Sequence, residues 1–335
     1  MRRLLVGLCL LAMAGGAAPV CRADDFYKGR NVDLYIGLAV GGTYDLYARA
    51  IARYLGRHIP GEPSVVPRSM PGAGGLTAAN YMYQVAPHDG TALAMTSQTL
   101  ALDQLFKVPG VAYDAGKFIW IGRVTSSPII FFTWHTSPSK SFADVLKRVT
   151  TMGSSGSGDT TDTPRALNRL AGAKFKLVLG YRGSTEVSLA VERGEVEGGY
   201  AAWDDLKHRK ADWLRDKIVN LLFLVADKPD PKYADLPLSD SLVTDPEAKK
   251  ILALFAAPNQ IGRSLFTTPG VPADRVAILR EAFVATLADP AFLADAARIG
   301  LIVDAASGNE LQEQVHAMLQ TPPSLIAKAD ASRQP

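Results

Sequence analysis

The chain has 335 residues, about twice the length typical of one domain, so two domains or lobes are expected. Hydrophobic residues make up 47% and charged residues 21%, a composition that excludes a disordered polyelectrolyte, a collagen-like repeat and a disulfide-rich scaffold. The net charge of +3 comes from residues 1–23, which hold three arginines and no acidic residue. The remainder is neutral, which disfavours binding to nucleic acid.

Residues 1–23 have the pattern of a secretory signal peptide. Two arginines follow the initial methionine, an apolar stretch covers 4–20, and the small Ala23 stands at the expected cleavage position before Asp24. The alternatives are an uncleaved membrane anchor, whose apolar stretch is weakened by glycine and proline, and a lipoprotein attached at Cys21. We expect a periplasmic protein.

Both cysteines, Cys9 and Cys21, lie inside this predicted signal. The mature protein is therefore expected to have no disulfide, no thiolate metal site and no cysteine nucleophile.

Strand, loop and helix alternate three times in the first part of the mature chain, which is typical of a parallel α/β sheet. The predicted strands are 32–37, 65–66 and 92–95. The predicted helices are 47–55 and 76–85.

The same alternation restarts after two apolar runs, 118–124 and 129–133, which are separated by Ser126, Ser127 and Pro128. This separation predicts that the chain crosses there from one lobe to the other. Further helices are predicted at 144–149, 164–171, 184–193, 272–288, 290–299 and 309–319. Further strands are predicted at 177–179, 196–200 and 221–225, the last returning toward the first lobe.

Enzyme motifs are missing from the sequence. The five histidines are scattered and form no metal-binding pattern. Gly153 and Gly158 have the spacing of a phosphate loop, but Asp159 stands where the lysine should be and would repel phosphates. We therefore expect no catalytic residues, no metal and no cofactor.

Four loops rich in glycine or hydroxyl side chains each follow a predicted strand. They are 41–45, 71–74, 96–98 and 153–158. In open α/β sheets such loops gather at the carboxyl ends of the strands, where ligands bind. Glycine lets a ligand approach the backbone, and a helix N-terminus favours negative charge, so the expected ligand is an anion.

These loops, together with 86–91, 181–184, 269–275 and 288–290, resemble the substrate-binding proteins of tripartite tricarboxylate transporters, the Bug family. The resemblance covers nearly the whole mature chain. It implies a two-lobed periplasmic binding fold (type II, Venus-flytrap), with each lobe a mostly parallel sheet flanked by helices. Lobe 1 would comprise 24–124 and 228–335, and lobe 2 would comprise 125–227.

By position, the resemblance also implies a ligand site made of loops from both lobes. The expected ligand-binding residues are Gly42, Thr43, Tyr44, Asp45, Gly72, Ala73, Gly74, Thr96, Ser97, Gln98, Ser155, Gly156, Ser157, Gly158, Trp203 and Asp204. Backbone dipoles and hydroxyl groups, rather than a dedicated Arg or Lys, are expected to neutralise the ligand.

Two departures from the family pattern put the usual small dicarboxylates in doubt: Ser69-Met70 replaces Asn-Arg, and Tyr44 replaces a small residue. Asp45 has a structural alternative as a helix cap, and Tyr44 and Trp203 have one as packing aromatics. If these two aromatics face the ligand, they favour a larger carboxylate.

The function implied is a monomeric solute receptor that delivers a carboxylate to the membrane permease subunits of a tripartite transporter. One alternative is a sensor that presents its ligand to a membrane kinase. Another is a periplasmic hydrolase or lyase that would use Asp45 with Asp204, for which no nucleophile or matched histidine is visible.

We predict that the mature protein begins near Asp24, because the only long apolar segment of the sequence precedes Ala23. Mass spectrometry of periplasmic extract measures this directly. Retention of residues 1–20, or a lipid on Cys21, would contradict the prediction.

Overall fold

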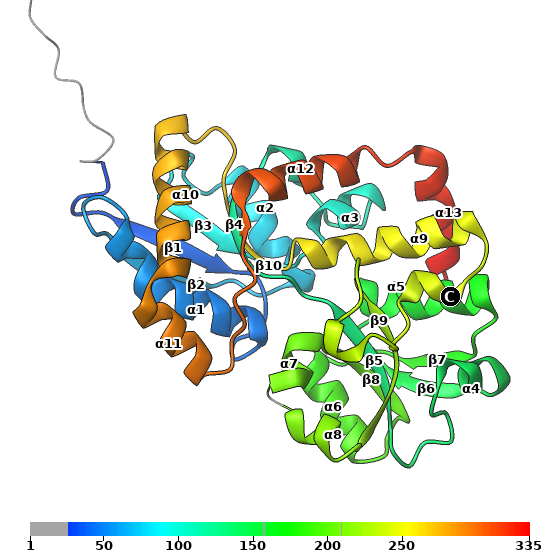
Figure 1. Ribbon diagram of the computed structural model, residues 1–335. Helices are drawn as coiled ribbons and strands as arrows, with labels where there is room; N and C mark the ends of the chain where they lie inside the picture. The colour runs from blue at the N-terminus through cyan, green and yellow to red at the C-terminus, as the bar shows by residue number, and fades with distance from the viewer. Residues whose placement is uncertain (1–25, 157, 209) are drawn as a thin grey trace, which may run out of the picture.

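The computed structural model describes residues 26–156, 158–208 and 210–335 (Figure 1). The predicted signal peptide, both cysteines and Ser157 lie outside the described residues. None of the helices described has the length and apolar character needed to cross a membrane.

The first lobe is built on a six-stranded sheet in the order β11-β4-β10-β3-β1-β2. The pairs β1–β2 and β1–β3 are parallel, and β10 is antiparallel to both β3 and β4. The strands are β1 (Asn31–Ile36), β2 (Ser64–Ser69), β3 (Ala92–Met95), β4 (Ile119–Thr125), β10 (Arg263–Thr267) and β11 (Ala306–Ser307).

Helices cover both faces of this sheet, because successive strand residues point to opposite sides. Val32, Leu34 and Ile36 pack with α1 (Thr43–Leu55), α10 (Ala273–Ala288) and α11 (Pro290–Arg298). Residues of the opposite face, including Tyr35, pack with α2 (Leu76–Gln84), α3 (Leu100–Leu105) and α12 (Gly308–Leu319).

The second lobe is built on a five-stranded sheet in the order β7-β6-β8-β5-β9. Its strands are β5 (Ile129–Trp134), β6 (Thr150–Gly153), β7 (Phe175–Val178), β8 (Gly198–Ala202) and β9 (Val219–Val225). Its helices are α4 (Phe142–Lys147), α5 (Asp159–Ala171), α6 (Ser184–Glu192), α7 (Trp203–His208) and α8 (Ala211–Arg215).

The predicted two-lobed α/β architecture is confirmed, and the sheets prove to be mixed. The parallel pairs are those joined through helices, as predicted, whereas β5 is antiparallel to both of its neighbours. Helix α5 begins at Asp159, before the predicted start at residue 164. Pro164 can lie inside it because the carbonyl of Thr160, which a proline cannot bond, accepts from the Ser154 hydroxyl (3.3 Å).

Two crossings join the lobes, and one asparagine is bonded to both. The first leads from β4 to β5, and the second leaves β9 and returns through α9 (Pro246–Ala256) to β10. Asn259 accepts from the Ser127 N–H at its backbone oxygen (2.9 Å), and its side chain donates to the Val225 carbonyl (2.8 Å).

Helices α9 and α13 (Pro323–Arg333) pack on α5, so the end of the chain contacts the second lobe. The division of the chain at 125 and 227 stays a prediction.

We predict that Gly122→Ala destabilises the first lobe. A Cβ atom at Gly122 would lie 2.3 Å from the buried Phe283 ring, so β4 or α10 must shift. The expected loss in the free energy of unfolding is about 1–3 kcal/mol. Chemical unfolding measures it, with Gly183→Ala as the control because no atom lies within 4 Å of that Cβ position. Equal stability of the two variants would contradict the prediction.

Candidate functional site

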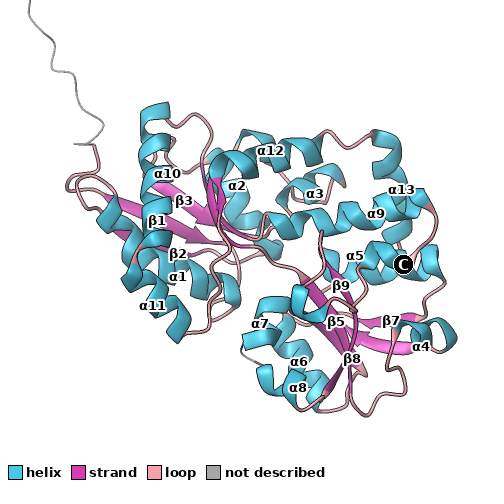
Figure 2. Ribbon diagram, viewed as in Figure 1, coloured by secondary structure: helices cyan, strands magenta, loops and turns pink. Residues whose placement is uncertain are grey.

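The loops predicted to bind a ligand approach one another at the junction between the two sheets (Figure 2). In the first turn of α1, the Tyr44 hydroxyl donates to Gln98 Oε1 (3.2 Å) in the loop after β3. Gln98 Nε2 in turn donates to Asp159 Oδ2 (3.2 Å), at the start of α5 in the second lobe. The lobes are therefore joined by direct side-chain contacts at the predicted site.

The loop after β3 contributes a buried and unsatisfied hydroxyl. Thr96 is buried, and its Oγ1 atom has no hydrogen-bond partner among the described residues. Ser97 is half-buried and bonds the Thr99 hydroxyl (2.8 Å). Thr96 is thus the residue of this loop with a free polar atom to offer.

Asp45 holds its own loop together. Its carboxylate accepts from the Gly41 N–H (2.9 Å) and from Arg49 Nε (2.8 Å). The Gly42 N–H donates to the Ala39 carbonyl (3.1 Å), while Thr43 is half-buried in the first turn of α1. These bonds of Asp45 are made within the loop and the first turns of α1, and among the described residues no side-chain bond caps this helix.

The glycine loop after β2 lies against the Thr96 loop. Gly72, Ala73, Gly74 and Gly75 all have positive φ, at 155°, 46°, 65° and 103°. A Cβ at Gly75 would lie 3.1 Å from the Ser97 nitrogen, so glycine permits the close approach. Ala73 and Gly74 are exposed, farther from the buried junction.

In the second lobe, an internal carboxylate occupies the helix N-terminus that was expected to attract an anion. Asp159 is buried at the start of α5, and desolvation raises its pKa to about 6 although hydrogen bonds from Gln98 and from the backbone N–H of Thr160 oppose the shift. The preceding Gly156 is exposed and Gly158 has φ 67°. Ser155 bonds the Thr160 hydroxyl (3.0 Å).

Trp203 and Asp204, which follow β8, point to different surroundings. The Trp203 indole packs on Tyr233 and donates to Asp230 Oδ2 (2.7 Å), so it serves as a packing aromatic. Asp204 instead reaches the first lobe, where its Oδ2 accepts from the Tyr47 hydroxyl (3.3 Å).

Arg263, the first residue of β10, is a residue that the sequence analysis missed. It is 2% exposed, and its guanidinium lies 5.1 Å from the centre of the Tyr44 ring and 5.7 Å from that of Tyr47. Its Nη2 atom is 3.8 Å from Asp204 Oδ1. Burial opposes the charge of Arg263, but Asp204 and the two tyrosines hold its pKa above the ordinary value.

This buried pair has unsatisfied polar atoms. Nε and Nη1 of Arg263 and Oδ1 of Asp204 have no hydrogen-bond partner among the described residues. Leaving buried charged groups without hydrogen bonds is costly, and such atoms commonly mark a place where a ligand or water binds. The expectation that backbone dipoles and hydroxyl groups neutralise the ligand stays a prediction, and the sequence analysis did not include this guanidinium. The available signal was an arginine close to the apolar pair Leu265-Phe266 in a short run with strand-forming residues.

A second group of carboxyls lies between α3 and α5. Desolvation raises the pKa of Asp103 to about 6 and that of Asp162 to about 7, and each of the two feels Asp159 as a further negative charge. Arg333 in α13 lies 3.7 Å from Asp162 and limits the shift. Burial therefore favours the protonated form of both carboxyls, Asp103 in the first lobe and Asp162 in the second.

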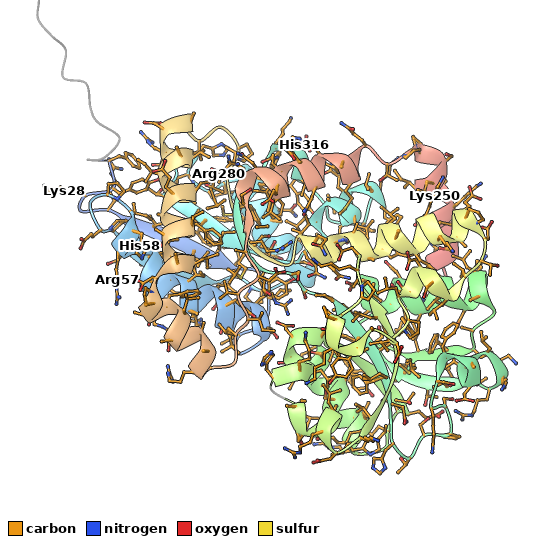
Figure 3. All side chains as sticks on the ribbon, in the orientation of Figure 1. Lys28, Arg57, His58, Lys250, Arg280 and His316 are labelled. Atoms are coloured by element: carbon orange, nitrogen blue, oxygen red, sulfur yellow. The ribbon has the colours of Figure 1, made fainter. Side chains whose placement is uncertain are left out.

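Several basic side chains lie away from the lobe junction. Figure 3 shows Lys28, Arg57 and His58 on one side of the first lobe, Arg280 and His316 at its top, and Lys250 on α9. His58 bonds Asp289 (3.2 Å), away from the lobe junction. No group of three potential ligands for a metal ion occurs in the described part of the chain.

Comparison with known proteins gives matches at the level of structure. No family model and no curated protein sequence matches the chain. A TctC solute-binding protein from Polaromonas is 18% identical with a TM-score of 0.64, over 90% of this chain and 99% of that chain. The periplasmic binding protein BugD is 20% identical with a TM-score of 0.67, over 90% and 98%. The fold is that of the TctC and Bug solute-binding proteins.

A third match is MatC from Rhodopseudomonas palustris with bound malate, 20% identical with a TM-score of 0.64, over 91% of this chain and 99% of that chain. These likenesses confirm the predicted resemblance at the level of the fold. The first two matched proteins are a solute-binding protein and a periplasmic binding protein, and this chain shares their fold.

We predict that Asp162→Asn stabilises the protein at neutral pH. The pKa of Asp162 is raised in the folded state, to about 7 from 3.8, so the folded state binds more protons and the wild type loses stability as the pH rises through this interval. The amide removes the carboxyl that burial disfavours, and Arg333 keeps Asp330 as a partner (2.6 Å). The expected gain near pH 7.5 is about 1–3 kcal/mol, shrinking toward pH 5.

Thermal melts across this pH range measure the effect. The matched control is Asp144→Asn. The Ser141 hydroxyl lowers the pKa of Asp144 and so stabilises its charged form, and replacing this carboxylate should therefore destabilise the protein at neutral pH. A pH-independent effect at Asp162, or a loss of stability there, would contradict the prediction.

Proposed function

We propose that the chain is a periplasmic substrate-binding protein that captures a carboxylated small molecule between its lobes and delivers it to a tripartite membrane transporter. The observation that carries the proposal is the buried Arg263 with two unpartnered nitrogens at the lobe junction. A guanidinium presents paired N–H donors in a planar fork that matches a carboxylate. The ligand would supply the acceptors that the protein does not.

The surroundings of Arg263 suit a small anionic group. Tyr44 and Tyr47 flank the guanidinium, and the free Thr96 hydroxyl is a further donor on the same lobe. Because the site is largely shielded from water, each hydrogen bond to the ligand is stronger than it would be on the surface. The bound malate of MatC, which shares the fold, supports a carboxylate as the ligand.

Binding would be coupled to closure of the lobes. Arg263, Tyr44 and Thr96 belong to the first lobe, whereas Asp159 and Asp204 belong to the second. A ligand held by both sets favours the closed arrangement over an open one by its differential affinity for the two. The predicted signal peptide supports export to the periplasm, where permease subunits of the transporter would receive the ligand.

We predict that Arg263→Gln abolishes carboxylate binding. In a thermal-shift screen of mono-, di- and tricarboxylates and amino acids, the mature wild-type protein should gain stability with at least one compound. At about 100 times the dissociation constant the gain is about 2.7 kcal/mol. The variant should fold, as shown by circular dichroism, but lose this gain.

Arg263→Lys tests the same site with the charge retained, and we expect weakened binding because a lysine cannot form the paired bonds. Arg182→Gln is the control, because this arginine is 87% exposed and pairs with Glu186. A folded Arg263→Gln protein that binds its carboxylate at full strength would refute the assignment of the site.

A further inference from the structure

The side chains buried at the lobe junction carry more negative than positive charge. Arg263 is flanked by Asp204, with Oδ1 3.8 Å from Nη2, and it also acts electrostatically on Asp159. Both aspartates are buried, with the Asp204 side chain 10% exposed. Asp205 also acts electrostatically on Arg263, so one guanidinium interacts with three carboxyl groups in a region of low dielectric constant.

Asp204 is poised to accept a hydrogen bond that the protein does not supply. Its Oδ2 atom receives the Tyr47 hydroxyl, but its buried Oδ1 atom has no partner among the described residues. The distance of 3.8 Å to Arg263 is too long for a direct hydrogen bond. The unpartnered Oδ1 of Asp204 thus lies near a guanidinium whose Nε and Nη1 atoms also lack partners among the described residues.

A ligand with only carboxylate groups can bond Arg263 but not Asp204. Its carboxylate would pair with Arg263, but it would add negative charge beside Asp204 and Asp159 and leave Asp204 Oδ1 without a donor. Like charges at such separations repel strongly where water is excluded. A dicarboxylate makes this imbalance worse.

We propose that the ligand is a zwitterion of the amino acid class, with its carboxylate on Arg263 and its ammonium group on Asp204 Oδ1. This assignment rests on the proposed function and narrows its substrate class. The ammonium group supplies the missing donor and offsets the second negative charge. Tyr44 and Tyr47 flank the guanidinium and carry no formal charge that would repel either pole of the ligand.

The test compares ligands that differ by one amino group. The full mature protein is titrated by calorimetry with the standard amino acids and with matched acids that lack the amino group, such as L-glutamate and glutarate, or L-phenylalanine and 3-phenylpropionate. We expect at least one amino acid to bind about tenfold or more tightly than its matched acid, because a buried acceptor left unpaired rejects the poorer ligand.

Asp204→Asn tests the residue. The variant should bind that amino acid about tenfold or more weakly and should lose most of the preference over the matched acid. Asp216→Asn is the control, because Asp216 is an exposed carboxylate of the same lobe paired with Arg215. Should Asp204→Asn fail to fold, the wild-type comparison of matched ligands decides the question alone.

The outcomes separate the two proposals. Matched acids that bind as tightly as the amino acids, or an Asp204→Asn protein with its preference intact, would overturn the zwitterion. If acids without an amino group bind and require Arg263, the proposed function stands without it. If neither kind of compound binds, both proposals fail.

Discussion

The burial of one guanidinium governs the arrangement of the lobe junction. Arg263 is 2% exposed, and burying an ion of this kind is costly unless nearby groups compensate it. The rings of Tyr44 and Tyr47 come from its own lobe, but the opposite charge, Asp204, comes from the other. In the observed arrangement, the contact between the lobes therefore also compensates the charge. In the proposed function, a ligand that completes the hydrogen bonds of Arg263 would favour this arrangement for the same reason.

The glycine loops alone do not explain how an anion would bind, because Asp159 already lies at one of the helix N-termini. The N-terminus of α5 attracts negative charge, but the chain supplies that charge itself, because Asp159 is the first residue of the helix. Its raised pKa shows that desolvation outweighs the favourable bonds from Gln98 and the backbone. The carboxylate of the proposed ligand would therefore be better accommodated at Arg263, where two guanidinium nitrogens lack hydrogen-bond partners among the described residues, than at this helix.

The architecture was predictable because local patterns define it. The apolar runs that became β1, β3, β4, β5 and β9 were recognisable from the sequence, and so were α1, α2, α4, α5 and α6 and the crossing near Pro128. The short helices α3, α7 and α8 were not predicted. Strand β10 was not recognised, because it begins with Arg263 and is stabilised by pairing with β4, more than a hundred residues earlier in the sequence. The loops of the site were predictable from glycine spacing. The partner of each side chain depends on which elements the fold brings together.

Trp203 and Asp45 show that the sequence does not reveal the partner of a side chain. Both have the chemistry of ligand-binding residues, but Asp230 takes up the indole N–H, and Gly41 and Arg49 take up the carboxylate. Tyr47 is the opposite case: the sequence placed it only as the first residue of the predicted helix 47–55, with no role at the site. Its ring is buried in the core, while its hydroxyl reaches Asp204 across the junction.

The site and the crossings between the lobes share a hydrogen-bonded connection. Gln98, which bonds Tyr44 and Asp159, also donates to Asn259 Oδ1 (2.6 Å). Asn259 in turn is bonded to Ser127 and Val225, one at each crossing. If the lobes rotate about these crossings, Asn259 moves little, whereas the bond from Gln98 to Asp159 breaks. Gln98 is thus bonded to Asn259 at the crossings and to Asp159 in the second lobe. A ligand that strengthens the contact between Gln98 and Asp159 would act on the crossings through two hydrogen bonds, from Gln98 to Asp159 and from Gln98 to Asn259. Neither sheet would need to be reordered.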